Sequence, residues 1–134
     1  MKILFICKHN RFRSKVAEVI FKKLDTRNEV KSAGIMIDFT RPWIAENVKK
    51  IMNEKGYEIK DEQSREINEQ DLEWADMIVI VANNIDKDIF KGKTNAEIEK
   101  WEITDADEKD EEKIRKIIGE IEGKVSNLLD SLNE

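Results

Sequence analysis

The sequence predicts an α/β fold in which helices cover both faces of a parallel, four-stranded sheet. Three observations lead to this prediction. The apolar run 3–6 is followed, at 14–24, by a segment whose apolar residues recur with helical spacing. A second apolar run, 76–82, is nearly continuous, as in a strand that is covered on both faces. The segment 114–132 is amphipathic with a helical period, and strands that alternate with helices favour parallel pairing.

The first half of the chain predicts two strand–helix units. The first helix should end near residues 25–28, and a short strand should cover 29–34. A second helix is expected to begin at Arg41-Pro42-Trp43 and to end at Gly56, because proline suits a first helical turn and glycine a helix end. One face of this helix is expected to hold Ile44, Val48, Ile51, Met52 and Lys55.

The second half predicts two further strands and two further helices. Residues 57–75 are polar and should end in a short helix that buries Leu72 and Trp74. A strand at 76–82 should lead into a loop and short helix at 84–90. A fourth strand is expected within 96–103, with Trp101 packed in the core, and the helix 114–132 should lie along the sheet.

Length and composition bound the possible functions. A chain of 134 residues is expected to form one domain, residues 1–134. Its net charge of −5 argues against a general nucleic-acid binder. No stretch resembles a membrane helix or a signal peptide, so a cytoplasmic protein without a membrane partner is expected. The single cysteine cannot form an internal disulfide, and no cluster of residues has the spacing of a metal site.

That cysteine lies in the segment most indicative of chemistry, Cys-x5-Arg-Ser between the first strand and the first helix. This placement should set the Cys7 thiol at the sheet edge, facing N–H groups that the first helical turn leaves unpaired. A helix N-terminus and a nearby arginine favour the thiolate, which is the nucleophilic form. Arg13 offers a planar fork of donors for two phosphate oxygens, and the Ser14 hydroxyl can bond the sulfur. Asn10 suits a left-handed turn.

A structural interpretation competes with this one. A lone cysteine after an apolar strand is more often a small buried hydrophobic residue than a nucleophile. A structural role, however, does not require an arginine and a serine at the start of the following helix. The strand, the Cys-x5-Arg-Ser loop and the helix together therefore favour a phosphate-binding cradle.

The segment resembles the active-site loop of low-molecular-weight protein tyrosine phosphatases and the related thioredoxin-coupled arsenate reductases. Both have an N-terminal strand that ends in Cys-x-x-Asn-x-x-Arg-Ser, which Cys7, Asn10, Arg13 and Ser14 match. The resemblance implies a single flavodoxin-like domain with strand order 2-1-3-4. It also implies a metal-independent, cofactor-free phosphatase that forms a phosphocysteine on Cys7. The phosphate-binding residues it implies are Lys8, His9, Asn10, Arg11, Phe12, Arg13 and Ser14.

The resemblance also implies a supporting serine and a general acid. Ser32 would form a hydrogen bond with the side chain of Asn10. The sequence alone is equally compatible with an ordinary serine at the end of a strand. The acid in the family is an aspartate, usually followed by proline, and Asp105 falls at its position. Ala106 replaces the proline, so Asp107 competes for the role. A solvated acidic run is the third interpretation of this stretch.

Departures from the family pattern bear on the substrate. Phe12 replaces a second cysteine, His9 replaces a glycine, and Lys8 and Arg11 make the rim basic. The aromatic residues that usually follow the acid are absent, so tyrosine specificity is less firmly implied than phosphatase chemistry. We expect hydrolysis of phosphate monoesters, on a phosphorylated protein, with phosphotyrosine first, or on a small molecule. Two alternatives remain: a phosphate-binding module without turnover, and an arsenate reductase, which the lack of two further cysteines disfavours.

Overall fold

The computed structural model of the protein describes residues 1–133, and a parallel sheet of four strands lies at its centre. The strands are β1 (Lys2–Cys7), β2 (Glu29–Gly34), β3 (Met77–Val81) and β4 (Glu97–Trp101). They lie in the order β2-β1-β3-β4, and every neighbouring pair is parallel. The predicted α/β class, the parallel pairing and the strand order are therefore confirmed.

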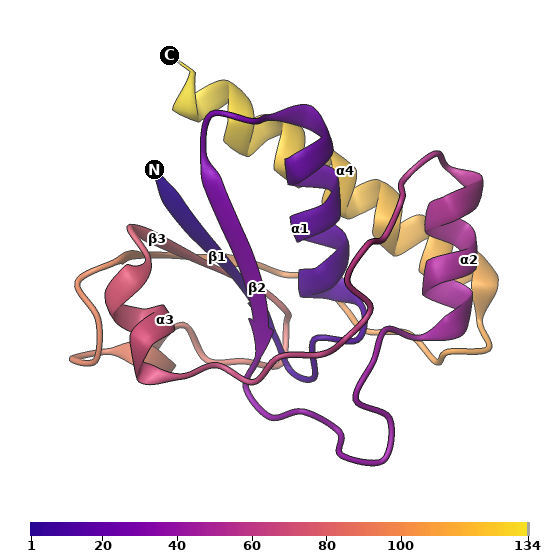
Figure 1. Ribbon diagram of the computed structural model, residues 1–134, viewed down its shortest axis with the longest axis horizontal. Helices are drawn as coiled ribbons and strands as arrows, with labels where there is room; N and C mark the ends of the chain where they lie inside the picture. The colour runs from indigo at the N-terminus through magenta and orange to yellow at the C-terminus, as the bar shows by residue number, and fades with distance from the viewer. Residues whose placement is uncertain (134) are drawn as a thin grey trace.

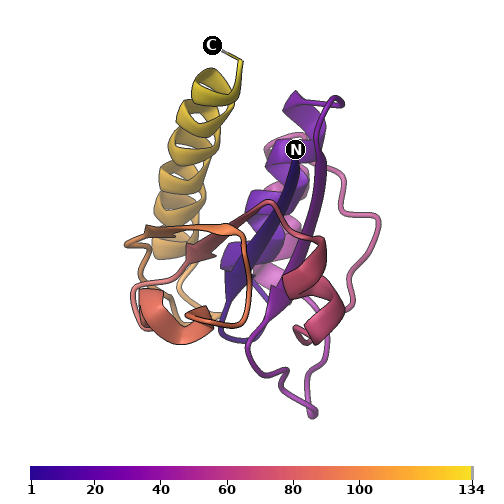
Figure 2. The ribbon, with the colours of Figure 1, turned by 90° about the vertical axis from the view of Figure 1, so that its left-hand side faces the viewer.

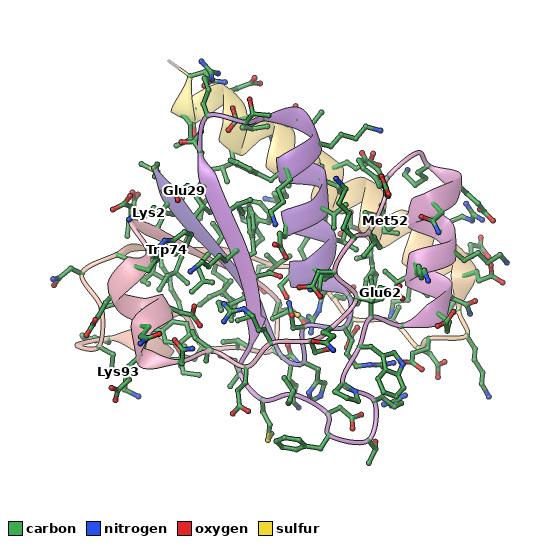
Figure 3. All side chains as sticks on the ribbon, viewed as in Figure 1. Lys2, Glu29, Met52, Glu62, Trp74 and Lys93 are labelled. Atoms are coloured by element: carbon green, nitrogen blue, oxygen red, sulfur yellow. The ribbon has the colours of Figure 1, made fainter. Side chains whose placement is uncertain are left out.

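Helices cover the two faces of this sheet unequally. One face carries α1 (Arg13–Leu24), α2 (Glu46–Glu54) and α4 (Glu111–Leu132), and the other carries α3 (Glu69–Trp74) and the 3-10 helix η1 (Lys87–Phe90) (Figure 1). Met52 of α2 and Trp74 of α3 accordingly lie on opposite sides of the sheet (Figure 3). Among the described residues, no helix is long and apolar enough to cross a membrane.

The apolar runs recognised in the sequence supply the core. Residues 3–6 of β1 and 78–81 of β3 are fully buried, because both strands lie inside the sheet and are covered on both faces. Trp101 packs in the core against Phe5, as predicted. Leu72 and Trp74 are only partly buried, and they pack against the smaller apolar cluster beneath α3.

The predicted start of the second helix is wrong. Residues 41–43 form no helix, and α2 begins only at Glu46. The amide of Ile44 donates to the Glu62 carbonyl and that of Ala45 to the Arg11 carbonyl, so these amides serve tertiary contacts instead of a first helical turn. The helix ends near Gly56, as predicted: Glu54 is its last residue, Lys55 is its C-cap, and Gly56 follows with a φ of +89°.

The strands run toward one edge, where their following loops meet. Both chain termini lie at the opposite end of the molecule (Figure 2). The chain leaves β1 toward β2 on one side, whereas β3 lies on the other side of β1. The carboxyl ends of β1 and β3 therefore form a point where the winding of the sheet reverses, the usual place for a ligand in such folds.

Candidate active site

Cys7 is the last residue of β1 and opens the loop at this edge of the sheet. The loop of residues 7–14, called here the cradle loop, runs from the end of β1 into the first turn of α1. The Cys7 sulfur lies 2.9 Å from the Ser14 Oγ. A pocket of about 410 Å³ opens over the loop, and Cys7, Arg13 and Asp105 all line it. The thiol is buried within the fold yet faces a cavity.

Asn10 holds the curl of the cradle loop. It is the one non-glycine residue with positive φ among residues 1–133, at 56°, a conformation that asparagine tolerates well. Its Nδ2 donates to the Ser14 Oγ at 2.8 Å and to the Ser32 Oγ at 3.0 Å. Its Oδ1 accepts the Arg65 amide at 3.0 Å. Ser32 thus contacts Asn10 in the way that the resemblance implied.

The backbone of the cradle loop is open to an anion. Within residues 1–133, the N–H groups of residues 8–12 have no backbone acceptor. The loop precedes the N-terminus of α1, which adds the positive end of a helix dipole. Such unpaired amides around a curled loop form a binding place for the oxygens of a phosphate-like group. Phe12 and Arg11 contribute side chains to the pocket walls.

Gly34 lets β2 approach the cradle loop, a role that the sequence pattern did not reveal. A Cβ added there would lie 2.8 Å from the carbonyl carbon of His9 and 2.9 Å from the amide nitrogen of Asn10. Any side chain would therefore push the loop backbone aside. The only sequence signal was a glycine at the last position of a strand, and glycine within strands often marks a close approach of two backbones.

Arg13 is 2% exposed, and its guanidinium is held by residues that the sequence reading did not single out. Nη1 donates to the Ile103 carbonyl at 2.9 Å, and Nη2 donates to the Asn84 Oδ1 at 3.3 Å. Both partners follow strands of the same sheet edge, β4 and β3 respectively. They orient the guanidinium toward the pocket that it shares with Cys7.

The two candidate acids, Asp105 and Asp107, have different neighbours in the structure. The Asp105 Oδ2 lies 3.8 Å from the Arg13 Nη2, and the Asp105 side chain is 56% exposed at the pocket mouth. Asp107 also lines the pocket, but its Oδ1 accepts the amide of Lys109 within its own turn. The Asp105 Oδ1 likewise accepts the amide of Ala106, which leaves Oδ2 as the oxygen that lies near the guanidinium of Arg13.

A cluster of charged side chains forms the rim, with Glu108 at its centre. Glu108 pairs with Arg11 and accepts from the Arg41 Nη1 at 3.0 Å. Burial lowers the pKa of Arg11, and the Arg41 cation lowers it further, while Asp38 and Asp105 act in the opposite direction. In the sequence, Glu108 stands where an aromatic residue of the family would follow the acid, and it belongs to the acidic run that a solvated surface would explain.

Two further residues of the cradle loop, Lys8 and His9, line the pocket. Lys8 is exposed at the pocket edge, and the His9 Nδ1 lies 2.7 Å from the Met36 carbonyl. His9 thus contacts the loop that follows β2 as well as the pocket.

No group of three or more His, Cys, Asp or Glu side chains is placed to hold a metal ion in the part of the chain that the structure describes.

Comparison with known proteins identifies the family of this fold and loop. The family model described as low molecular weight phosphotyrosine protein phosphatase matches residues 2–134. The chain belongs to this family. A curated relative, a putative arsenate reductase of Halobacterium salinarum, is 25% identical over 98% of this chain and 93% of its own length.

Solved structures of the family superpose over nearly the whole chain. An arsenate reductase from Archaeoglobus fulgidus is 28% identical, with a TM-score of 0.76 over 96% of this chain and 98% of that one. An arginine phosphatase from Geobacillus stearothermophilus is 25% identical, with a TM-score of 0.78 over 98% of this chain and 92% of that one. Members of the phosphatase family and proteins named as arsenate reductases thus share this architecture.

Proposed function

We propose that this family member is a cysteine-dependent phosphatase that hydrolyses phosphate monoesters, with protein phosphotyrosine as its substrate. The observation that carries the proposal is the shared pocket of three groups: the Cys7 thiol, the Arg13 guanidinium and the Asp105 carboxyl. A nucleophile, an oxyanion-binding fork and an acid are what a two-step phosphoryl transfer needs. The proposed compartment is the cytoplasm, where a thiol nucleophile stays reduced.

The first step forms a phosphocysteine. The Cys7 thiolate attacks phosphorus in line, forming an S–P bond while the bond from phosphorus to the leaving oxygen breaks. Asp105 transfers its proton to that oxygen, so the leaving group departs as a neutral hydroxyl compound. Arg13 and the amides of residues 8–13 bind the equatorial oxygens, whose charge they stabilise in the transition state. Ser14, 2.9 Å from the sulfur, stabilises the thiolate.

The second step returns the enzyme to its starting state. The Asp105 carboxylate accepts a proton from water as the water oxygen bonds to phosphorus. The S–P bond breaks, the thiolate leaves with its electron pair, and inorganic phosphate is released. Asp105 is again protonated and Cys7 is again a thiolate, so no oxidant, reductant or cofactor enters the cycle.

The first experiment combines turnover with binding. We expect the purified protein to hydrolyse an aryl phosphate, inorganic phosphate to inhibit it, and Cys7→Ser to remove the activity. A trapped adduct with the mass of one phosphoryl group should be found on Cys7, the only cysteine. Hydrolysis by Cys7→Ser at the wild-type rate would contradict the mechanism. Tight phosphate binding without any turnover would instead indicate the binding module.

A substrate panel separates the activities that relatives carry in their names. Peptides with phosphotyrosine and with phosphoarginine should be compared, because one structural relative is an arginine phosphatase. Arsenate reduction is the second candidate, since two relatives are named as arsenate reductases. A reduction relayed within the chain needs further thiols, and this sequence holds one cysteine. Arsenate-dependent oxidation of thioredoxin by the protein would overturn our preference for the phosphatase.

A further inference from the structure

A chain of hydrogen bonds connects the Cys7 sulfur to a carboxylate on α1 that the proposed mechanism does not use. The sulfur lies 2.9 Å from the Ser14 Oγ, and the Asn10 Nδ2 donates both to Ser14 and to Ser32. The Ser32 hydroxyl in turn donates to the Glu18 Oε1 at 2.5 Å. The Glu18 side chain is only 14% exposed, so this carboxylate is largely shielded from water.

The direction of each hydrogen bond in this chain follows from the chemistry of its members. The Arg65 amide donates to the Asn10 Oδ1, so the amide nitrogen of Asn10 must face the two hydroxyls. An amide nitrogen only donates, and both hydroxyls therefore accept from it. The Ser32 hydroxyl donates its hydrogen bond to Glu18, because a carboxylate can only accept.

At the other end of this series of hydrogen bonds, Ser14 lies between Asn10 and the Cys7 sulfur, as Ser32 lies between Asn10 and Glu18. Because its oxygen accepts from Asn10, its single hydrogen is free for another acceptor. The two acceptors within reach are the Cys7 sulfur at 2.9 Å and the Ala33 carbonyl at 3.4 Å. A negative sulfur at the shorter distance is the stronger acceptor. The hydrogen is then directed at the thiolate.

We propose that Glu18 is a positioning residue that keeps this chain polarised toward the Cys7 thiolate. By accepting the Ser32 hydrogen, Glu18 leaves Ser32 as an acceptor for Asn10, which holds Asn10 between the two serines. Without that acceptor, the Ser32 hydrogen can rotate toward the Asn10 amide and meet another donor, which weakens the hold on the cradle loop. This inference rests on the proposed role of Cys7 as nucleophile, but Glu18 itself lies outside the pocket over Cys7.

The test measures the reactivity of Cys7 directly, without turnover. The rate at which iodoacetamide alkylates the protein reports this one cysteine, and inorganic phosphate should protect it. In Glu18→Gln the side-chain amide can donate to Ser32, so that the Ser32 hydrogen loses its carboxylate acceptor and the bond from Asn10 to Ser32 weakens. We expect alkylation at neutral pH to slow about fivefold, the effect of one weakened hydrogen bond. If the protein hydrolyses aryl phosphates, kcat should fall with little change in KM.

The matched control concerns the ion pair of Glu18 on the helix surface. Lys22 donates to the Glu18 Oε2 at 2.7 Å, so Lys22→Gln removes this pair and leaves the Ser32 bond in place. We expect Lys22→Gln to alkylate at the wild-type rate. An equal loss in Lys22→Gln and Glu18→Gln would overturn the proposal, because it would assign the effect to surface charge. Thermal unfolding checks that each variant is folded at the assay temperature.

Two further variants keep the proposal testable if Glu18→Gln folds poorly. Glu18→Asp keeps the charge but is one methylene too short to reach Ser32, and it should slow alkylation as Glu18→Gln does. Alkylation at the wild-type rate in Glu18→Asp would contradict the proposed positioning role of Glu18. In a Ser32→Ala background, Glu18→Gln should cause no further loss, whereas additive losses would also overturn the proposal. A protein without phosphatase activity would refute the proposed function and leave this alkylation test intact.

Discussion

At the scale of single residues, Arg13 connects the parts of the site that the chain brings from far apart. Its guanidinium contacts the Ile103 carbonyl, the Asn84 side chain and, at 3.8 Å, the Asp105 carboxylate. Its burial removes competing water and strengthens each of these interactions. The first prediction concerns the carboxylate that this arginine faces.

Asp105→Asn should slow hydrolysis of substrates with poor leaving groups by about 10²–10⁴-fold, the range expected for a lost general acid. Substrates whose leaving group is a weak base should be affected much less, because they need little protonation. Asp107→Asn is the matched control and should behave nearly as wild type, since Asp107 bonds only within its own turn. The measurement is kcat for a series of aryl phosphates. A large loss in the Asp107 variant with Asp105→Asn still active would move the acid to Asp107.

A second prediction at this scale concerns Gly34, whose missing side chain lets the cradle loop lie against β2. In Gly34→Ala the new methyl group would meet backbone atoms of His9 and Asn10 at under 3 Å. Backbone cannot yield as a flexible side chain does, so we expect a loss of about 1–3 kcal/mol in unfolding free energy. Phosphate affinity should fall as well, because the displaced loop supplies the binding amides.

Gly119→Ala is the control for this change. Gly119 lies in α4, and a Cβ there would meet nothing within 4 Å among the described residues. Alanine favours a helix over glycine by about 1 kcal/mol, so this variant should be more stable than wild type. Urea unfolding of both variants measures the two effects, which should have opposite signs. Equal stability of Gly34→Ala and wild type would show that the loop can move aside.

At the scale of elements, the loop at residues 102–110, called here the acid loop, is held by contacts with three other segments. Glu108 pairs with Arg11 of the cradle loop and with Arg41 of the loop after β2. Its carbonyl accepts the Asn47 Nδ2 of α2 at 2.7 Å. A proline after Asp105 would stiffen this loop locally, but the residue there is Ala106, and ion pairs with other segments hold the loop.

Glu108→Gln should therefore disturb the acid although Glu108 lies three residues from Asp105. We expect kcat to fall about tenfold, since small misplacements of a catalytic group are costly. Salt should reduce the difference between wild type and variant, because these pairs are partly exposed. Glu111→Gln is the matched control: it breaks an exposed pair with Lys50 outside the pocket and should leave kcat unchanged. Equal effects of the two substitutions would contradict this role.

At the scale of the whole molecule, α4 is tied to the segment after α2 by the single tyrosine of the chain. The Tyr57 hydroxyl donates to the Glu122 Oε2 at 2.6 Å, and Lys55 pairs with the same carboxylate at 2.8 Å. These contacts join the end of α2 to the middle of α4 across the helical layer on one face of the sheet. Burial, and then the hydrogen bond to Glu122, raises the pKa of Tyr57 to about 12.

This shift predicts how stability depends on pH. The pKa of Tyr57 rises on folding from 10.0 to about 12, so the folded protein holds the phenol proton more tightly than the unfolded chain. The stabilisation is fully present below pH 10 and is lost as the pH rises toward about 12. Because Tyr57 is the only tyrosine, tyrosinate absorbance follows it alone. Titration in native buffer should have a higher midpoint than titration in urea.

Tyr57→Phe provides the control for this titration. The variant should lose about 1 kcal/mol of stability at neutral pH, the net value of one hydrogen bond. It should also lose the part of the alkaline destabilisation that belongs to Tyr57, so the two proteins should converge in stability as the pH rises. Identical midpoints in native buffer and in urea would show that Tyr57 is not held by Glu122.

The sequence alone determined the α/β class, the core strands and the cradle loop, because these depend on local patterns. Buried strands appear as continuous apolar runs, and Cys7, Asn10, Arg13 and Ser14 lie within the short segment 7–14, from the last residue of β1 to the first turn of α1. The order of the strands and the support of Asn10 by Ser32 came from resemblance, and the structure has both.

Only the tertiary structure decided what depends on groups distant in the chain. The second helix begins at Glu46 and not at Arg41 as predicted. The reason is that the amides of the two residues before Glu46 donate to the carbonyls of Glu62 and Arg11 and not to carbonyls within a helix. Asp105 faces Arg13 because β4 lies beside β3 at one edge of the sheet. The two residues are far apart in the sequence, so no local sequence pattern indicates that they meet. The contacts of Glu18 and Glu108 likewise arise where separate segments pack together, since a hydrogen bond or ion pair between distant residues leaves no periodic signal in the sequence.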